Sequence, residues 1–134
     1  MRLGKHSIPE VAIDFMNRDH QVFIDLVISL EQQLSVKTDP ALISQTLDEL
    51  LQHTVAHFAE EEKHMRAASF PPYPVHHQEH QQVLAGLQEQ IVAWSKKHDA
   101  TKLMKYVQDT LPAWLAHHVQ SMDFVTAAWL ARAR

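Results

Sequence analysis

Four stretches of this chain repeat apolar side chains at alternating steps of three and four residues, the period of an α-helix that buries one face. In the first stretch the predicted buried seam comprises Ile13, Met16, His20, Phe23, Val27, Leu30 and Leu34. In the second it comprises Ile43, Leu47, Leu50, Thr54, His57, Glu61 and Met65. The last two comprise His76, His80, Leu84, Leu87, Ile91 and Trp94, then Leu111, Leu115, His118, Met122, Val125 and Trp129. With only two glycines in 134 residues, these seams predict an all-α chain.

Residues typical of helix ends separate the first two stretches. Pro9 or Glu10 is expected to start the first helix, which ends near Val36. Thr38 or Asp39 then caps the second helix, whose first turn contains a proline. Because short connections favour antiparallel neighbours, we predict an antiparallel up-down-up-down four-helix bundle.

The second half of the chain contains a stiff loop and one expected irregularity. Three prolines fall within residues 69–74, so we expect a loop there, followed by a third helix over residues 75–97. Asp99 or Thr101 opens the last helix. Pro112 lies inside that helix, and because proline removes a backbone hydrogen bond we expect a kink or a short break there.

The composition excludes several classes of protein. A net charge of −4 gives no basic field for nucleic acid or an anionic membrane, and no apolar run approaches the roughly 18 residues of a membrane helix. The lack of cysteine excludes disulfides, thiolate metal sites and iron–sulfur clusters, and it suits a reducing compartment. We expect one cytoplasmic domain over residues 1–134, with a short N-terminal arm over residues 1–9 and no signal peptide.

Histidine is the unusual component, with eleven in the chain, five of them on the predicted seams. Together with two carboxylates they form a set of seven donors: His20, His57, Glu61, His76, His80, His118 and Asp123. A single histidine on an apolar stripe is usually an ordinary core residue. Several buried polar groups, at about 1–3 kcal/mol for each one without a partner, would exhaust the roughly 5–15 kcal/mol of a small domain. A bound cation removes this cost because it coordinates imidazoles and neutralises carboxylates, so we predict a metal site.

Helix geometry brings the seven donors toward one end of the bundle. The first helix starts, the second ends, the third starts and the fourth ends at the same pole, and at 1.5 Å per residue the donors lie roughly 3–20 Å from it. Asp123 is off the seam, because it lies five residues after His118 and about 140° around an α-helix from it. We therefore expect Asp123 to reach only a metal at one side of the last helix.

The remaining histidines test the choice of seam. Surface positions are predicted for His6, His53, His77, His98 and His117. Of these, His77 shares a polar face with Gln81 and Gln88. His64 is the alternative ligand, because it lies two turns after His57 and nearly in line with it.

Four segments resemble the hemerythrin family, in particular its single-domain bacterial members with the HHE cation-binding pattern. The matching pieces are Asn17-Arg18-Asp19-His20, His57-Phe58-Ala59-Glu60-Glu61-Glu62 with Met65, Tyr73-Pro74 with His76-x-x-x-His80, and Trp114-Leu115-x-x-His118-Val119 with Asp123. The resemblance covers about residues 13–130. Each piece alone is a weak signal, whereas the ordered set of seven donors is highly specific.

The resemblance implies a pair of iron ions joined by an oxo or hydroxo bridge. It assigns one iron to His76, His80 and His118, the other to His20 and His57, and both to the bridging Glu61 and Asp123. It also implies that dioxygen binds reversibly to the two-histidine iron, which is one ligand short. The expected function is therefore oxygen storage, delivery or sensing, and not catalysis.

Four further residues are candidates for the oxygen pocket. Phe23, Phe58 and Trp114 are expected to form an apolar wall that keeps water from the open iron, although each also suits an ordinary core position. Ser121 stands three residues after His118, where the animal members of the family tend to have an apolar side chain. We expect its hydroxyl to admit water or protons and so to speed autoxidation.

Other functions fit the same donors less well. A di-iron oxidase, a nitric oxide-handling protein or an iron-cluster repair protein remains an alternative, but relatives of the repair type have fewer histidines at the site. A ferritin-like ferroxidase would need two Glu-x-x-His elements, and only Glu61-x-x-His64 fits. A metal-switched signalling module would need a separate signalling or electron-transfer partner.

Overall fold

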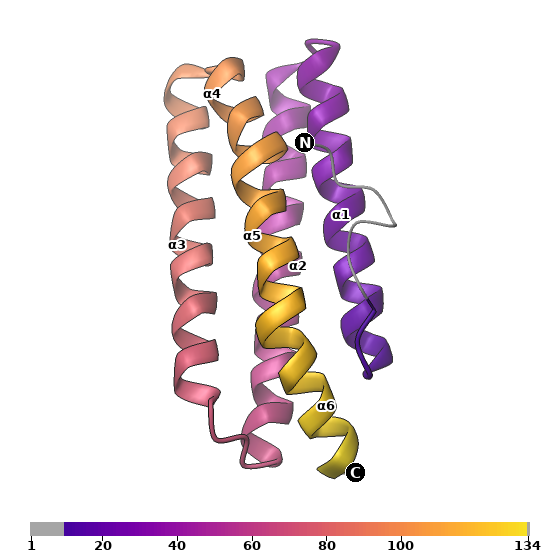
Figure 1. Ribbon diagram of the computed structural model, residues 1–134. Coiled ribbons are helices and arrows are strands. Elements are labelled where there is room, and N and C mark those ends of the chain that lie inside the picture. Colours follow the sequence, from indigo (N-terminus) through magenta and orange to yellow (C-terminus); the bar gives the residue numbers. More distant parts are fainter. Residues whose placement is uncertain (1–9, 134) are drawn as a thin grey trace.

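Residues 10–133 are described by a computed structural model, in which the chain folds into four antiparallel helical rods (Figure 1). The first three rods are α1 (Asp14–Ser35), α2 (Pro40–Ala67) and α3 (Tyr73–Lys97). The fourth rod is a continuous succession of α4 (Ala100–Lys105), η1 (Tyr106–Thr110), α5 (Leu111–His118), η2 (Val119–Asp123) and α6 (Phe124–Ala133), in which η1 and η2 are π-helical turns. These residues contain no strand, and the predicted all-α four-helix bundle is confirmed.

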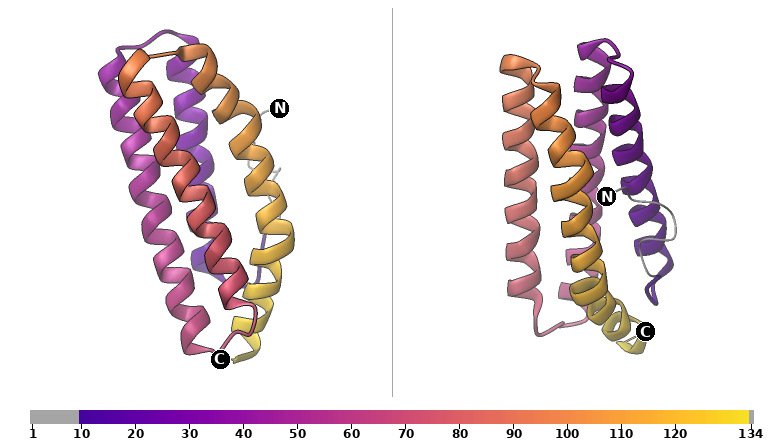
Figure 2. Two further views of the ribbon diagram at one scale, coloured as in Figure 1. Left: turned by 90° about the vertical axis from the view of Figure 1, so that its left-hand side faces the viewer. Right: turned by 45° about the horizontal axis from the view of Figure 1, so that its top comes forward.

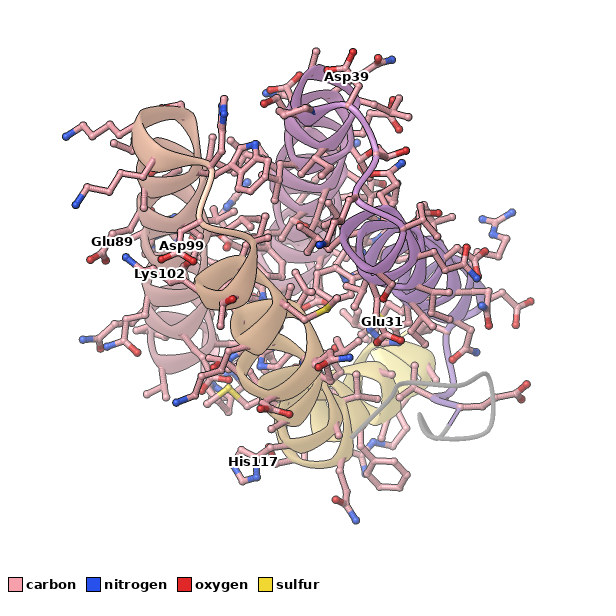
Figure 3. The ribbon with its side chains drawn as sticks, turned by 90° about the horizontal axis from the view of Figure 1, so that it is seen from above. Glu31, Asp39, Glu89, Asp99, Lys102 and His117 are labelled. Carbon is pink, nitrogen blue, oxygen red and sulfur yellow. The ribbon has the colours of Figure 1, made fainter. Side chains whose placement is uncertain are left out.

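The four rods occupy the corners of a square when the bundle is seen from above (Figure 3). Rod α2 packs between α1 and α3, and the fourth rod closes the opposite corner through contacts with the same two helices. Figure 2 shows this fourth rod curving around the bundle toward the C-terminus. None of the helices among residues 10–133 combines the length and the apolar character needed to cross a membrane.

Two aspartates cap helices at the top of the bundle (Figure 3). The side chain of Asp39 accepts a hydrogen bond of 3.0 Å from the backbone N–H of Ala41, so Asp39 is the cap of α2, with Pro40 as its first residue. Asp99 accepts one of 3.1 Å from the N–H of Lys102 and caps α4 in the same way. In both places the cap is the aspartate, and not the threonine (Thr38 or Thr101) that the sequence also allowed.

The start of α1 differs from the prediction. The helix begins at Asp14 and not at Pro9 or Glu10, because the backbone before it is held by a side chain instead of helical hydrogen bonds. The N–H of Val11 donates to Asn17 Oδ1 at 2.8 Å, and Asn17 Nδ2 donates to the carbonyl of Val11 at 2.9 Å. Pro9 and the rest of the predicted arm over residues 1–9 lie outside the described residues.

The fourth rod is irregular in a way that the sequence predicted only in part. Pro112 produces no break, and the irregularity is the π turn η1, which ends just before α5 and its proline. A π turn closes at i+5 instead of i+4, so it absorbs one extra residue within a helix that otherwise continues. The lost hydrogen bond of the proline is thereby accommodated without ending the rod.

The second π turn, η2, displaces the predicted seam by one residue. The buried positions beyond it are Asp123, Thr126, Ala127 and Leu130, whereas Met122, Val125 and Trp129 had been predicted. Val125 is in fact 53% exposed. The earlier seam residues on α1 and α2 are all buried as predicted, because no such insertion interrupts those helices.

The interior has an apolar half and a polar half. Leucines from all four rods fill the half near the α1–α2 and α3–α4 connections, among them Leu30, Leu47, Leu50, Leu87 and Leu103, each at most 2% exposed. The half toward the start of α1 and the end of α2 buries histidines and carboxylates in addition to apolar side chains such as Met16 and Met65. The candidate site therefore lies within the bundle and not on its surface.

Candidate metal centre

All seven predicted donors are brought together in the polar half of the bundle. They come from α1 (His20), α2 (His57, Glu61), α3 (His76, His80), α5 (His118) and η2 (Asp123), and none is more than 7% exposed. Their donor atoms fall into two groups in which all atoms lie within 4.8 Å of one another. The first group is Glu61, His76, His80, His118 and Asp123, and the second is His20, His57 and Asp123.

The three-histidine group is closely packed around one point. Glu61 Oε1 lies 2.8 Å from His76 Nε2 and 3.2 Å from His80 Nε2. Asp123 Oδ1 lies 2.9 Å from His118 Nε2 and 3.2 Å from His76 Nε2. The two Nε2 atoms of His76 and His118 are 3.1 Å apart. All five side chains thus aim a donor atom at a shared position.

The two-histidine group uses the other oxygen of each carboxylate. Glu61 Oε2 lies 3.2 Å from His57 Nε2, and Asp123 Oδ2 lies 2.8 Å from His20 Nε2. Each carboxylate therefore presents one oxygen to the three-histidine group and one to the two-histidine group. Two carboxylates in this arrangement can bridge a pair of cations.

The chemistry of these donors fits a cation better than mutual hydrogen bonds. Four buried atoms of the centre form no hydrogen bond with any of residues 10–133, although other donor atoms lie within 3.2 Å: both oxygens of Glu61, His80 Nε2 and Asp123 Oδ1. An ion such as zinc binds imidazole nitrogens at about 2.0–2.1 Å, so two ligands at a right angle stand about 3 Å apart. The separation of His76 and His118 matches this spacing.

The π turn η2 explains how Asp123 joins His118. Five residues along an α-helix place two side chains about 140° apart, which led us to expect Asp123 at one side of the rod. In a π turn, residues five apart are hydrogen-bonded neighbours and lie on one face. The expectation of a sideways approach is therefore wrong, because His118 and Asp123 flank a π turn and both point inward.

Four of the five histidines are held from behind through Nδ1. His57 Nδ1 lies 2.8 Å from Asp19 Oδ2, His80 Nδ1 2.8 Å from Glu62 Oε2, His118 Nδ1 2.6 Å from Glu79 Oε1, and His76 Nδ1 2.9 Å from Thr126 Oγ1. These partners fix the ring orientation and keep the proton on Nδ1, which leaves Nε2 free as a ligand.

The sequence analysis gave none of these outer partners a role. Asp19, Glu62 and Glu79 are each adjacent in the sequence to a predicted ligand, namely His20, Glu61 and His80, so an acidic residue beside a ligand was the available signal. Thr126 gave no such signal, because its inward direction depends on the π turn η2.

Electrostatics in the centre favour positive charge. Burial alone would lower the pKa of His57, but the carboxylates of Asp19 and Glu61 raise it to about 10. Burial is likewise outweighed at His76, where Asp123 and Glu61 raise the pKa to about 9. Burial alone would raise the pKa of Glu61 and Asp123, yet the close imidazoles hold both well below the usual range. The centre thus combines ionised carboxylates with sites that attract protons or cations.

A small cavity adjoins the two-histidine group. Its volume is about 10 Å³, room for the centre of one water-sized molecule. The donors that line it are His20, His57, His118 and Asp123, and its apolar lining includes Phe23, Phe58, Trp114 and Leu115. Two of the predicted wall residues also stack on site histidines, Trp114 on His118 with ring centres 4.6 Å apart and Phe58 on His80 at 3.7 Å.

Ser121 does not take part in this cavity. It is exposed, and its hydroxyl donates a hydrogen bond of 2.7 Å to the carbonyl of His117. Ser121 was predicted in an oxygen pocket, but it does not line this cavity, because it lies on the outer face of the fourth rod within the π turn η2. His53 was predicted on the surface, but it is half-buried and lines the cavity. Its Nε2 lies 2.9 Å from the carbonyl oxygen of Asp19.

The other histidines lie outside the centre. His64, the alternative ligand, is exposed, stacks on Phe15 and has its Nε2 3.1 Å from Glu60. His117 points outward from the fourth rod (Figure 3). His77 is partly exposed, as predicted for a polar face, but its Nδ1 also lies 2.6 Å from Glu62. His98 is exposed as predicted at the end of α3, whereas His6 lies outside the described residues.

Comparison with known proteins gives one family. Residues 11–130 match the family described as "Hemerythrin HHE cation binding domain". A bacteriohemerythrin of Aquifex aeolicus (strain VF5) is 30% identical over 130 residues, which cover 97% of this chain and 98% of the relative. One of Ralstonia nicotianae is 41% identical over 86 residues, 64% of this chain and 61% of the relative. No solved structure matches the chain.

Proposed function

This chain belongs to the hemerythrin HHE cation-binding family, and on that premise we propose that it binds dioxygen reversibly at a pair of iron ions. In this proposal His76, His80 and His118 would hold one iron, His20 and His57 would hold the other, and Glu61 and Asp123 would each contribute an oxygen to both. The observation that carries this assignment is the pairing of carboxylate oxygens, one toward each histidine group. Imidazoles and carboxylates together suit iron in either oxidation state.

In this proposal dioxygen would bind on the side of the centre formed by His20 and His57. The cavity is lined by both of these histidines, but by only His118 of the other three. Iron in this position supplies the redox chemistry that makes dioxygen binding reversible. The protein contributes the confined space beside it, where Phe23, Phe58 and Trp114 exclude water.

The size of the cavity favours binding over catalysis. A space of about 10 Å³ holds the centre of one water-sized molecule, whereas pockets for organic substrates are usually about 300–1,000 Å³. We therefore propose a role in oxygen storage, delivery or sensing and not the oxidation of an organic substrate.

Anaerobic loading with ferrous iron followed by exposure to air tests the proposal. We expect two iron ions per chain and a visible ligand-to-iron absorption band that forms with oxygen and disappears when oxygen is removed. Immediate and irreversible bleaching would reject reversible binding and favour a redox enzyme. His118→Ala should reduce the iron content sharply, whereas the matched control His117→Ala, on the exposed neighbour, should leave it unchanged.

A further inference from the structure

We propose that the two cation positions fill in a fixed order, the three-histidine position first and the two-histidine position second, as a weaker and exchangeable site. The proposal rests on the di-iron centre proposed above. It follows from a difference in how the two groups of histidines are held. Among residues 10–133, all three histidines of one group have a partner behind them, whereas one of the two histidines of the other group has such a partner.

The three-histidine position is held by two layers of contacts. Glu62 holds His80, and Glu62 is in turn fixed by His77 Nδ1 at 2.6 Å. Glu79 holds His118, and Thr126 holds His76. Because these rings are already oriented, a cation that binds there orders few groups. Loss of one such outer partner typically weakens metal binding 10–100-fold.

Aromatic rings clamp two of the same histidines. Phe58 lies nearly parallel to the ring of His80, with an interplanar angle of 7°, and Trp114 lies nearly parallel to His118 at 18°. These rings restrict tilting of the imidazoles in the direction that the hydrogen bonds leave open. The first position is thereby preorganised for its ion.

The two-histidine position is held less firmly. His57 has the carboxylate of Asp19 behind it, which is 30% exposed, similar to the 24% of Glu79 behind His118. His20 Nδ1 is buried and has no hydrogen-bond partner among residues 10–133. A proton on His20 is satisfied at Nε2, where Asp123 Oδ2 accepts at 2.8 Å. Metal binding through Nε2 would move that proton to Nδ1, where no protein group accepts it.

The charges around the two positions favour the same order of filling as the contacts that hold the histidines. The first cation is surrounded by oxygens from both Glu61 and Asp123, with Glu62 and Glu79 behind its histidines. The second cation must share the two bridging carboxylates with a neighbour of the same charge. Coulomb repulsion between the two ions therefore weakens the second binding step whichever position fills first, and the two carboxylates behind the three-histidine position, against one behind the other, favour that position for the first ion.

Because the two positions fill in order, the number of ions bound to the protein depends on the metal supply. When iron is scarce, the one-ion form accumulates, with its cation in the three-histidine position. The cavity adjoins the two-histidine position, so this form lacks the ion beside the space proposed for dioxygen. Oxygen binding would then require enough iron to fill the second position.

A titration of the metal-free full-length protein with cobalt(II), followed by visible absorption and calorimetry, tests this order. We expect two steps of one ion each, separated by at least about tenfold in affinity. Asp19→Ala should weaken the second step about 10–100-fold and leave the first unchanged. Glu79→Ala should weaken the first step and so reduce the difference in affinity between the two steps. Glu60→Ala, at an exposed carboxylate on the same helix as His57, should change neither step.

Asp19→Asn is the control for misfolding, because its amide oxygen can still accept a hydrogen bond from His57 Nδ1. We expect it to weaken the second step less than Asp19→Ala does. Uptake of both ions in a single step, or equal weakening of both steps by Asp19→Ala, would overturn the order. Cobalt does not report on dioxygen, so ordered loading without reversible oxygen binding of the iron form would reject only the proposed function.

Discussion

Four of the five site histidines use their two ring nitrogens for different contacts, and this division explains the electrostatics of the centre. Nε2 faces the shared carboxylates, and Nδ1 of every site histidine except His20 faces an outer partner. The negative charges at Asp19 and Glu61 make positive charge favourable around His57. In the metal-free protein this charge is a proton on the imidazole, and in the loaded protein it is a metal ion.

Metal loading should therefore depend on pH. The pKa of His57 is raised to about 10 and that of His76 to about 9, above the usual value of about 6.5, so in the metal-free protein each carries a second proton, on Nε2, at neutral pH. A cation displaces these protons, and its apparent affinity should rise between about pH 6 and pH 9 and level off above about pH 10. Cobalt(II) titrations in a series of buffers, with proton release measured in parallel, check this. An affinity independent of pH would contradict it.

The wall of the cavity offers a second test at single residues. Trp114→Ala removes a ring that lines the cavity and should shorten the lifetime of the oxygenated form roughly tenfold, equivalent to about 1.4 kcal/mol in the barrier. Ser121→Leu is the matched control, because Ser121 is exposed outside the cavity and its replacement should leave the lifetime unchanged. The decay of the visible absorption band measures both. A lengthened lifetime in Ser121→Leu would show that the hydroxyl does admit water or protons.

The sequence revealed the donors because of where they lie on the helices. His57 and Glu61 occupy seam positions, where a polar residue is conspicuous. The outer partners were not found, because Asp19 and Glu79 lie beside the seams, where charged residues normally face solvent. Their inward contacts depend on distances between helices, which a single sequence does not contain.

The elements differ in how far their sequence periods determine them. The seams of α1 and α2 were predicted in full, because each helix keeps one hydrogen-bonding pattern from end to end. The fourth rod was predicted only up to His118, because a π turn adds one residue to the helix without any distinctive composition. The five-residue spacing from His118 to Asp123 was the visible trace of that turn, and we interpreted it as a sideways approach.

The cap of α2 can be tested by comparison with its neighbour. Asp39→Ala removes the acceptor for the N–H of Ala41 and should lower the free energy of unfolding by about 1 kcal/mol. Thr38→Ala, at the other position that the sequence allowed, should have little effect. Urea denaturation of the metal-free variants provides the measurement, since neither residue lies near the centre. Equal losses in the two variants would contradict the assignment of Asp39 as the cap.

At the scale of the whole molecule, the fold and the centre depend on each other. Short connections predicted the antiparallel topology, and that topology brings donors from α1, α2, α3 and the fourth rod to one depth. The apolar half contributes ordinary core packing. The polar half buries carboxylate oxygens that lack hydrogen bonds, such as both oxygens of Glu61, so it is incomplete without a cation.

Metal loading should therefore stabilise the whole bundle. A ligand that binds only the folded protein adds about 2.7 kcal/mol when its free concentration is 100 times Kd, which for a chain of this size corresponds to a rise in Tm of roughly 10 °C. Thermal unfolding of the metal-free and cobalt(II)-loaded protein, followed by circular dichroism, measures the rise. His118→Ala should lose most of it, because His118 Nε2 lies 2.9 Å from the bridging Asp123. His117→Ala should keep the rise in full, because this neighbour is exposed, and an equal loss in both variants would show that the added metal acts elsewhere.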